Sequence, residues 1–137
     1  MATLEQHRQS IVTAVEAAKA SFTGYPLVIE YDNRIIVDTA TQLDPFLVVN
    51  IRFLDGAQAD LSANPIHRKV GQIHLQAATK EGAGSAKALV LLEHFYRALQ
   101  RSQFGGVRTR MASFAREQAF KGWVYYPALV PFWADDN

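Results

Sequence analysis

Apolar residues recur every three to four positions over the first 22 residues of the chain, which is the pattern of an amphipathic helix. The apolar stripe comprises Leu4, Ile11, Val15, Ala18 and Phe22. Thr3 and Gln6 have the spacing of a capping box, in which each side chain satisfies a free backbone N–H of the other residue. The pattern therefore predicts a helix from Thr3 to about Phe22, ended by Gly24 and Pro26.

The segments that follow change from helical spacing to alternation with a period of two, which predicts strands. A short strand is expected at Leu27–Tyr31, and a longer one at Phe46–Phe53 after the break at Asp44-Pro45. A third strand is expected at His67–Ala77, where apolar residues again alternate with polar ones. Each of the two longer strands should bury one face.

A second helix is predicted from about Ser85 to Ser102, because an apolar stripe returns at helical spacing. The residues expected to face the core are Ala88, Leu89, Leu92, Phe95, Tyr96 and Leu99. Alternation resumes over Val107–Phe114, which predicts a strand with Arg108 and Arg110 on one face.

Residues 115–120 give a weak signal, which we interpret as one turn of helix, and Trp123–Trp133 reads as a final strand. The order is therefore helix, two or three strands, helix, two strands. Because helices and strands do not alternate, a parallel doubly wound sheet is disfavoured. The pattern predicts a single α+β domain over residues 1–137, with two helices packed on a mostly antiparallel β-sheet.

The final strand is apolar or aromatic on both faces. Pro127 and Pro131 lack the amide hydrogen that a central strand needs, so we expect this strand at an edge of the sheet. An edge with two apolar faces favours a defined partner, although a local cluster within the chain would also cover it. The residues expected at a subunit or partner interface are Tyr125, Tyr126, Leu129, Phe132 and Trp133.

Two further stretches are candidates for contact with other molecules. Arg108 and Arg110 suit phosphate groups or the carboxylates of a neighbouring subunit, and a solvated outer face accounts for them equally well. Residues 55–65 are polar, with Leu61 as their only large apolar side chain, and such a loop is often functional. We expect this loop to be mobile in the free protein and ordered by a neighbour, through Asp55, Gln58, Asp60, Asn64 and His67.

The composition is that of a globular domain, with 49% hydrophobic and 20% charged residues. The net charge is only +1, which gives no reason to expect general binding to nucleic acid or to a membrane surface. The chain has no cysteine, which excludes disulfides, a thiol nucleophile and a cysteine-based zinc site. The first residues lack the apolar segment of a signal peptide, and no apolar run approaches the length of a membrane span.

Few residues have the spacing that catalysis or metal binding needs. The four histidines are His7, His67, His74 and His94, and none belongs to a zinc-binding motif. Gly82-Ala83-Gly84-Ser85 lacks the other residues of a phosphate-binding loop, so a strand-to-helix turn with Ser85 as cap is favoured. Glu30 and Asp32 are interpreted as solvated carboxylates. We therefore expect no enzymatic activity, no metal site and no cofactor.

Four stretches, taken in their order and spacing, point to a known family. They are Pro45–Val49, Arg68–Leu75, Gly82–Ser85 with the helix that follows, and Gly122–Phe132. Together with the N-terminal helix, they resemble the tail terminator-like proteins of long-tailed phages, which are related to the tail terminator of phage lambda. The resemblance implies an α+β fold and a homohexameric ring. Such a ring caps the tail tube, stops tube polymerisation and provides the docking face for the head connector.

The resemblance also implies partners and a location. The partners would be further copies of the chain, the tail-tube protein and a head-completion or connector protein. DNA would only pass through the ring lumen, which Arg108 and Arg110 would face if they do not serve an assembly surface. The protein of a phage or prophage would be assembled in the host cytoplasm and located in the virion tail. Two alternatives stay open: another neck or head–tail joining protein and, from a different class, a small-molecule-binding or enzymatic α+β domain.

Overall fold

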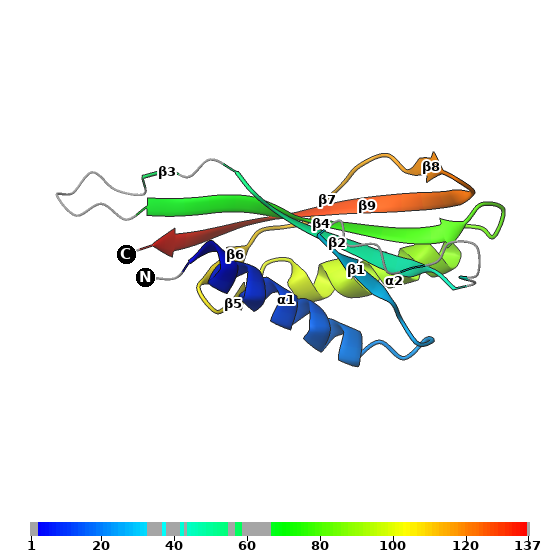
Figure 1. The fold of residues 1–137 in the computed structure, drawn as a ribbon, viewed down its shortest axis with the longest axis horizontal. Coiled ribbons are helices and arrows are strands. Elements are labelled where there is room, and N and C mark those ends of the chain that lie inside the picture. Colours follow the sequence, from blue (N-terminus) through cyan, green and yellow to red (C-terminus); the bar gives the residue numbers. More distant parts are fainter. Residues whose placement is uncertain are drawn as a thin grey trace.

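The computed structural model describes residues 3–32, 37, 42, 44–54, 57–58 and 67–136. These residues contain two helices, α1 (Leu4–Ala20) and α2 (Ala86–Leu99), and a nine-stranded sheet. The strands are β1 (Ile29–Tyr31), β2 (Phe46–Phe53), β3 (Ala57–Gln58), β4 (His67–Lys80), β5 (Gln103–Phe104), β6 (Val107–Thr109), β7 (Ser113–Phe114), β8 (Gln118–Phe120) and β9 (Trp123–Asp136). The long strands β4 and β9 run side by side along the molecule (Figure 1).

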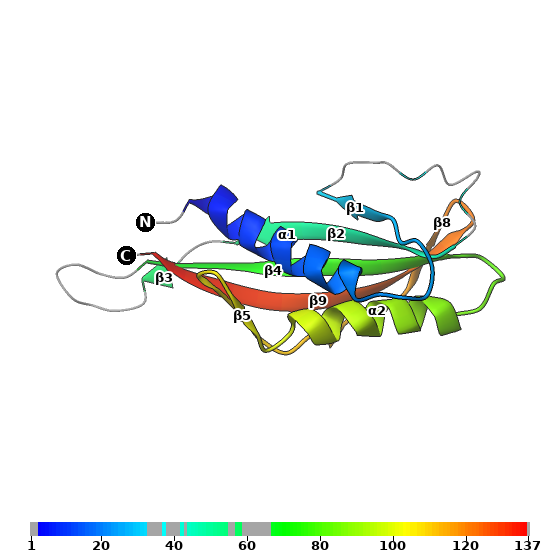
Figure 2. The same ribbon diagram turned by 90° about the horizontal axis from the view of Figure 1, so that it is seen from below.

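The sheet has the strand order β1-β2-β4-β9-β6-β5, with β3 beside β4, and with β7 and β8 beside β9. β1 runs parallel to β2, whereas the other described pairs are antiparallel. Both helices lie on one side of the sheet (Figure 2). The predicted α+β class is confirmed. The sheet is mixed, which the alternation could not reveal, because side chains alternate with a period of two in both kinds of strand.

The main core lies between the two helices and one face of the sheet. The strands contribute alternate residues to it, namely Leu47 and Val49, Ile73, Leu75 and Ala77, and Ala128, Val130, Phe132 and Ala134. The helices contribute Ile11, Val15 and Ala18, and Ala88, Leu91, Leu92, Phe95 and Leu99. Leu89, which we expected in this core, is 47% exposed. Leu91 takes its place, because it lies one turn from Ala88 and Phe95 on the same helix face.

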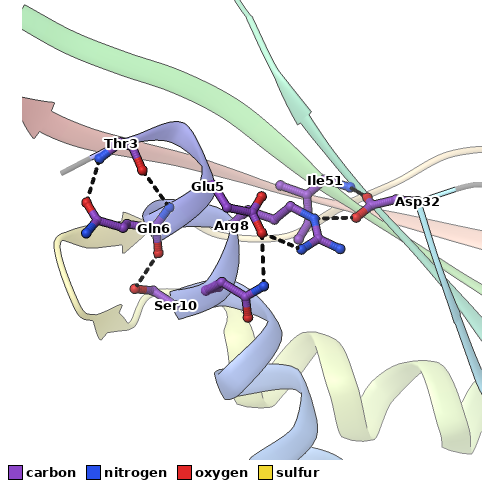
Figure 3. Close-up of polar contacts among 8 residues, drawn as sticks. Thr3, Glu5, Gln6, Arg8, Ser10, Asp32 and Ile51 are labelled. Carbon is purple, nitrogen blue, oxygen red and sulfur yellow. Dashed lines mark hydrogen bonds and ion pairs between the residues drawn. The ribbon is translucent and has the colours of Figure 1, made fainter.

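The N-terminus of α1 is held by the predicted capping box and by Arg8 (Figure 3). The Thr3 hydroxyl accepts a hydrogen bond from the Gln6 amide at 3.1 Å, and the Thr3 amide donates to the Gln6 side chain at 2.7 Å. One turn later, Arg8 Nε donates to Asp32 Oδ2 at 2.6 Å, and Asp32 Oδ1 accepts from the Ile51 amide at 3.0 Å. Asp32 thereby connects α1, the end of β1 and β2, and it is not the freely solvated carboxylate that we expected.

The expected edge position of the final strand is wrong. β9 pairs with β4 over its whole length and with β6, β7 and β8 on its other side. The Pro127 and Pro131 carbonyls accept hydrogen bonds from the amides of Ala115 and Arg110, at 3.4 and 2.9 Å. Because N–H and C=O of one residue point to the same side of an antiparallel strand, the missing donors of both prolines face away from β4.

The two prolines coincide with gaps in the second ladder of β9. β6 ends at Thr109 opposite Phe132, and β7 pairs only with residues 128 and 129, so Pro131 falls between them. Pro127 falls between the partners of β7 and β8 in the same way. The strand predicted at Val107–Phe114 is therefore interrupted. The helical turn expected at residues 115–120 is also absent, because Gln118–Phe120 forms β8.

Candidate assembly interface

The five aromatic and apolar residues singled out on the final strand separate onto two faces of the sheet. Phe132 lies in the main core at 2% exposure, and its ring meets the Phe53 ring at right angles with centroids 5.5 Å apart. A Cβ at Gly71 would overlap both the Phe132 ring and the Arg52 carbonyl oxygen. Phe132 is thus covered by its own chain, which corrects its assignment to an interface. Tyr126 packs against the same core and is half-buried.

Tyr125, Leu129 and Trp133 lie on the helix-free face, where each stays partly exposed. The Trp133 ring has the Arg110 guanidinium 4.6 Å from its centroid and the Arg68 guanidinium 5.7 Å from it. At the other end of the strand, Tyr125 joins a small cluster with the buried side chains of Phe46, Ala78 and Trp123. Burial and the nearby Glu30 carboxylate raise the pKa of Tyr125.

Polar residues of β4 occupy the centre of this helix-free face. Gln72, His74 and Gln76 stand opposite Pro131, Leu129 and Pro127 in the ladder. Gln72 contacts the His74 ring at 3.2 Å. Burial, with a contribution from the Arg52 cation, holds the pKa of His74 below its usual value of 6.5. The face is therefore neither a wholly apolar nor a strongly charged surface at its centre.

The stretch beside β9 is more distinctive, and we call it the arginine–aromatic edge. It is defined by six exposed residues, Arg108, Arg110, Met111, Phe114, Arg116 and Phe120. Met111 is 65% exposed, and Phe114 and Phe120 are each 59% exposed. The Phe114 ring packs edge-on against Tyr96 of α2, with centroids 5.1 Å apart. Arginine, methionine and aromatic residues are enriched at the centres of protein–protein interfaces, so this edge has the composition of a contact surface.

The expected alternation of Arg108 and Arg110 against Thr109 is confirmed, since both arginines are exposed and Thr109 is buried. Sequence analysis missed Met111, Phe114 and Phe120 as surface candidates. These residues were overlooked because an apolar residue in a predicted strand or helical turn is assigned to the core by default. The proline gaps in β9 leave this stretch only short strands, so several of its apolar side chains point to solvent.

The residues of the predicted contact loop are only partly described. Asp55, Asp60 and Asn64 lie outside the described residues. Gln58 and His67 form a backbone pair between β3 and β4. A role for these five residues in contacts with a neighbouring subunit or with the tail tube stays a prediction.

A second candidate surface is the α1–α2 pocket, a cavity of about 590 Å³ between the connection from α1 to β1 and the first turns of α2. Its walls include Phe22, Tyr25, Asp44, Lys87, Val90 and His94. The Tyr25 hydroxyl is buried and has no hydrogen-bond partner among the described residues. Burial and the Asp44 carboxylate raise the pKa of Tyr25 to about 12. This phenol therefore stays protonated at neutral pH.

His94 and Ser85 are the other residues of α2 and its N-terminus that sequence analysis considered for chemistry. His94 Nε2 lies 2.8 Å from the Ala18 carbonyl oxygen and 3.1 Å from Ser21 Oγ, at the end of α1. Ser85 is the N-cap residue of α2, but its side chain makes no capping hydrogen bond. No group of three or more metal-ligating side chains occurs among the described residues. In the same part of the chain, neither helix combines the length and apolarity that crossing a membrane requires.

No protein-family model matches the sequence, and no curated protein sequence matches it. The fold, in contrast, matches solved structures along almost the whole chain. One solved chain, whose name states no function, superposes with a TM-score of 0.71 at 14% identity, covering 100% of this chain and 99% of the other. A chain from the virion of a native gene transfer agent particle superposes with a TM-score of 0.59 at 15% identity, covering 94% of this chain and 97% of the other. At such identities the similarity shows a shared fold.

Proposed function

We propose that this chain is a structural protein of a phage-like particle and serves as its tail terminator. In that role it forms a homohexameric ring on the tail tube, stops tube polymerisation and provides the docking face for the head connector. Its partners are further copies of itself, the tube protein and the connector, and DNA passes through the lumen. The role requires no catalytic residue and no cofactor.

The observation that supports a structural role in a phage-like particle is the fold match to a chain of a gene transfer agent virion, which extends over 94% of this chain. Because nearly the whole of both chains is covered, the match is between complete architectures rather than a shared helix–strand motif. The resemblance of four sequence stretches to tail terminator-like proteins is a separate line of support, since it was drawn from residues and not from coordinates. Fold alone does not assign a role, so the specific role rests on the sequence resemblance.

The surface of the subunit suits a ring component. A ring in which each subunit touches two neighbours needs two different surfaces on each subunit. The described residues offer the arginine–aromatic edge and the α1–α2 pocket, which lie on different elements. A ring that joins a tube to a connector also needs two axial faces. The helix-free face and the ends of β4 and β9 are available for that purpose.

Loss of the gene in a host that produces the particles tests the role. A terminator limits tube length, so its loss should give tails longer than normal that carry no heads. Electron microscopy of the released particles measures both features. Tails of normal length without heads would contradict the terminator role and favour the alternative of another neck or head–tail joining protein. Normal infectious particles would contradict both and favour a small-molecule-binding or enzymatic domain.

A further inference from the structure

The arginines of the two layers differ in their partners. In the helix layer, Arg8 pairs with Glu5 and Asp32, and Arg97 pairs with Glu93. Three exposed arginines on the helix-free face have guanidinium groups that form no ion pair or hydrogen bond within the described part of the chain. They are Arg52, Arg108 and Arg110. These cations are therefore available to groups of opposite charge on another molecule.

The register of the sheet places two of these arginines on either side of a polar residue. Arg52 on β2 stands opposite Gln72 on β4, and Gln72 stands opposite Pro131 on β9. The amide of Arg110 donates to the Pro131 carbonyl, so Arg110 continues the same row. Residues that are opposite one another in a sheet lie on one face. With roughly 4.8 Å between neighbouring strands, the backbones of Arg52 and Arg110 lie about 14 Å apart.

Trp133 orders the arginines at one side of this row. The Arg110 guanidinium lies 4.6 Å from the centroid of the Trp133 ring, and Arg108 stands opposite Trp133 in the next row. Packing against an aromatic ring holds a guanidinium in place and leaves its N–H donors free to bind another group. We call this part of the helix-free face the arginine patch. It is defined by Arg52, Gln72, Arg108, Arg110 and Trp133.

The described residues place no unpaired acidic side chain within the arginine patch. Glu30 lies on the same face, two rows from Arg52, and accepts a hydrogen bond from the Val37 amide at 2.9 Å. At the end of the ladder, Asp135 stands opposite a further arginine, Arg68, so this row adds no net charge. The patch is therefore locally basic, although the whole chain has a net charge of only +1.

The polar residues beside the arginines favour a nucleic acid over a protein as partner. The centre of the face is formed by the side chains of Gln72, His74 and Gln76, whereas the centre of a protein–protein interface is its most apolar part. Interfaces with DNA are more polar and more positively charged. The separation of about 14 Å across the row is also close to the width of the major groove of B-DNA, about 12 Å.

We propose that the arginine patch binds the phosphate backbone of double-stranded DNA, with Arg52 and Arg110 contacting phosphates on the two rims of a groove. The inference rests on the proposed function, which brings DNA next to this protein, and deepens it by naming the surface that contacts the DNA. The patch covers only part of the helix-free face, so the remainder stays available for axial contacts. Because the contacts are to phosphates, binding should be independent of sequence and should weaken as salt is raised.

Fluorescence anisotropy of a short labelled DNA duplex, titrated with the full chain over a series of salt concentrations, tests the proposal. Arg52→Gln and Arg110→Gln should each weaken binding by roughly threefold to tenfold and reduce the salt dependence by about one phosphate contact. Gln72→Glu should weaken binding as well, because it places a carboxylate between the two arginines without removing either. Arg97→Gln is the matched control, since it removes an exposed arginine on α2, and it should bind like the unaltered protein.

Circular dichroism confirms that each variant is folded. A duplex that does not bind at low salt, or that binds the Arg52→Gln and Arg110→Gln variants as tightly as the unaltered protein, would overturn the proposal. A loss in Arg97→Gln as large as in the patch variants would also contradict it, because binding would then follow total charge.

Poly-glutamate is the probe for an acidic protein as the partner. If it bound more tightly than the duplex and through the same arginines, the assignment to DNA would be wrong. These outcomes concern the DNA contact and leave the terminator role intact. Tails of normal length after gene loss would instead contradict that role, whether or not the isolated protein binds DNA.

Discussion

The guanidinium of Arg110 lies 4.6 Å from the centroid of the Trp133 ring, so a residue that follows β6 is held against the helix-free face of β9. Arg110 also donates its backbone amide to the Pro131 carbonyl at 2.9 Å. These two contacts fix the chain at the point where β6 ends. The short connection from there to β7 begins with the exposed Met111, so the Arg110–Trp133 pair positions the part of the arginine–aromatic edge that follows β6.

Phe132 and Trp133 are neighbours in the chain, but Phe132 is buried in the core and Trp133 is partly exposed on the helix-free face. Substitution of each residue should therefore affect stability to a different extent. Phe132→Ala removes a fully buried ring and should lower the free energy of unfolding by about 3–5 kcal/mol. Trp133→Ala removes a partly exposed ring with its cation–π contacts and should cost roughly 1–2 kcal/mol. Urea unfolding followed by circular dichroism measures both. Equal losses of unfolding free energy in the two variants would contradict the placement of these residues on opposite faces of the sheet.

Local signals along the chain predicted most helices and strands, but they did not predict which strands pair with one another in the sheet. The capping box of Thr3 and Gln6 and the alternation of residues 46–53 each depend on interactions within a few residues, and both predictions are confirmed. The position of β9 in the sheet depends on β4 and β6, which are distant in sequence. The two prolines of β9 suggested an edge strand, because each lacks a backbone N–H. The sequence does not show on which side of the strand these missing donors lie, so the prediction of an edge was wrong.

The candidate interface was predictable only in part, for a related reason. Arg108 and Arg110 were identified, since charged residues at alternate positions of a strand project to one side. Phe132 was misassigned, because an apolar strand reveals that both faces need cover but not which face the helices take. Phe114 was overlooked, because its exposure depends on the position of β7 beside β9, which is a tertiary feature.

Asp32 should matter more for stability than its position after a short strand suggests. Asp32→Ala leaves both Arg8 Nε and the Ile51 amide without their acceptor, so the free energy of unfolding should fall by about 1–3 kcal/mol. Glu5→Ala is the matched control, because it removes an exposed carboxylate that contacts Arg8 and Gln9 on the helix surface, and it should have little effect. Urea unfolding of both variants provides the comparison. A loss for Glu5→Ala as large as that for Asp32→Ala would contradict the bridging role.

His74 should make stability depend on pH. Its pKa is lower in the folded chain than the usual 6.5, through burial and the Arg52 cation, so the unfolded chain takes up the proton first as pH falls. Stability from this residue is therefore present above about pH 6.5 and is lost as pH falls toward the lower, folded pKa. Urea unfolding at about pH 7.5 and about pH 5 measures the loss.

The same measurement on His74→Gln isolates this residue from the other titrating groups. Glutamine is neutral at both pH values and continues the row of Gln72 and Gln76 on β4. The loss of stability on acidification should be smaller in the variant than in the unaltered protein. An equal loss in both proteins would show that His74 does not contribute to the pH dependence.

The orientation of the prolines in β9 gives the sharpest test of the sheet. Pro131→Thr adds an amide donor on the side of the gap between β6 and β7, where no ladder bond to β4 is affected, so stability should change by no more than about 1 kcal/mol. Val130→Pro removes a donor on the opposite side, toward β4, and should cost about 3 kcal/mol or more. Val130→Ala controls for the loss of the buried side chain and should fall between the two. Amide hydrogen exchange along β4 should be faster in Val130→Pro and unchanged in Pro131→Thr. The reverse order of stability would place the prolines on the β4 side and contradict the register of the two longest strands.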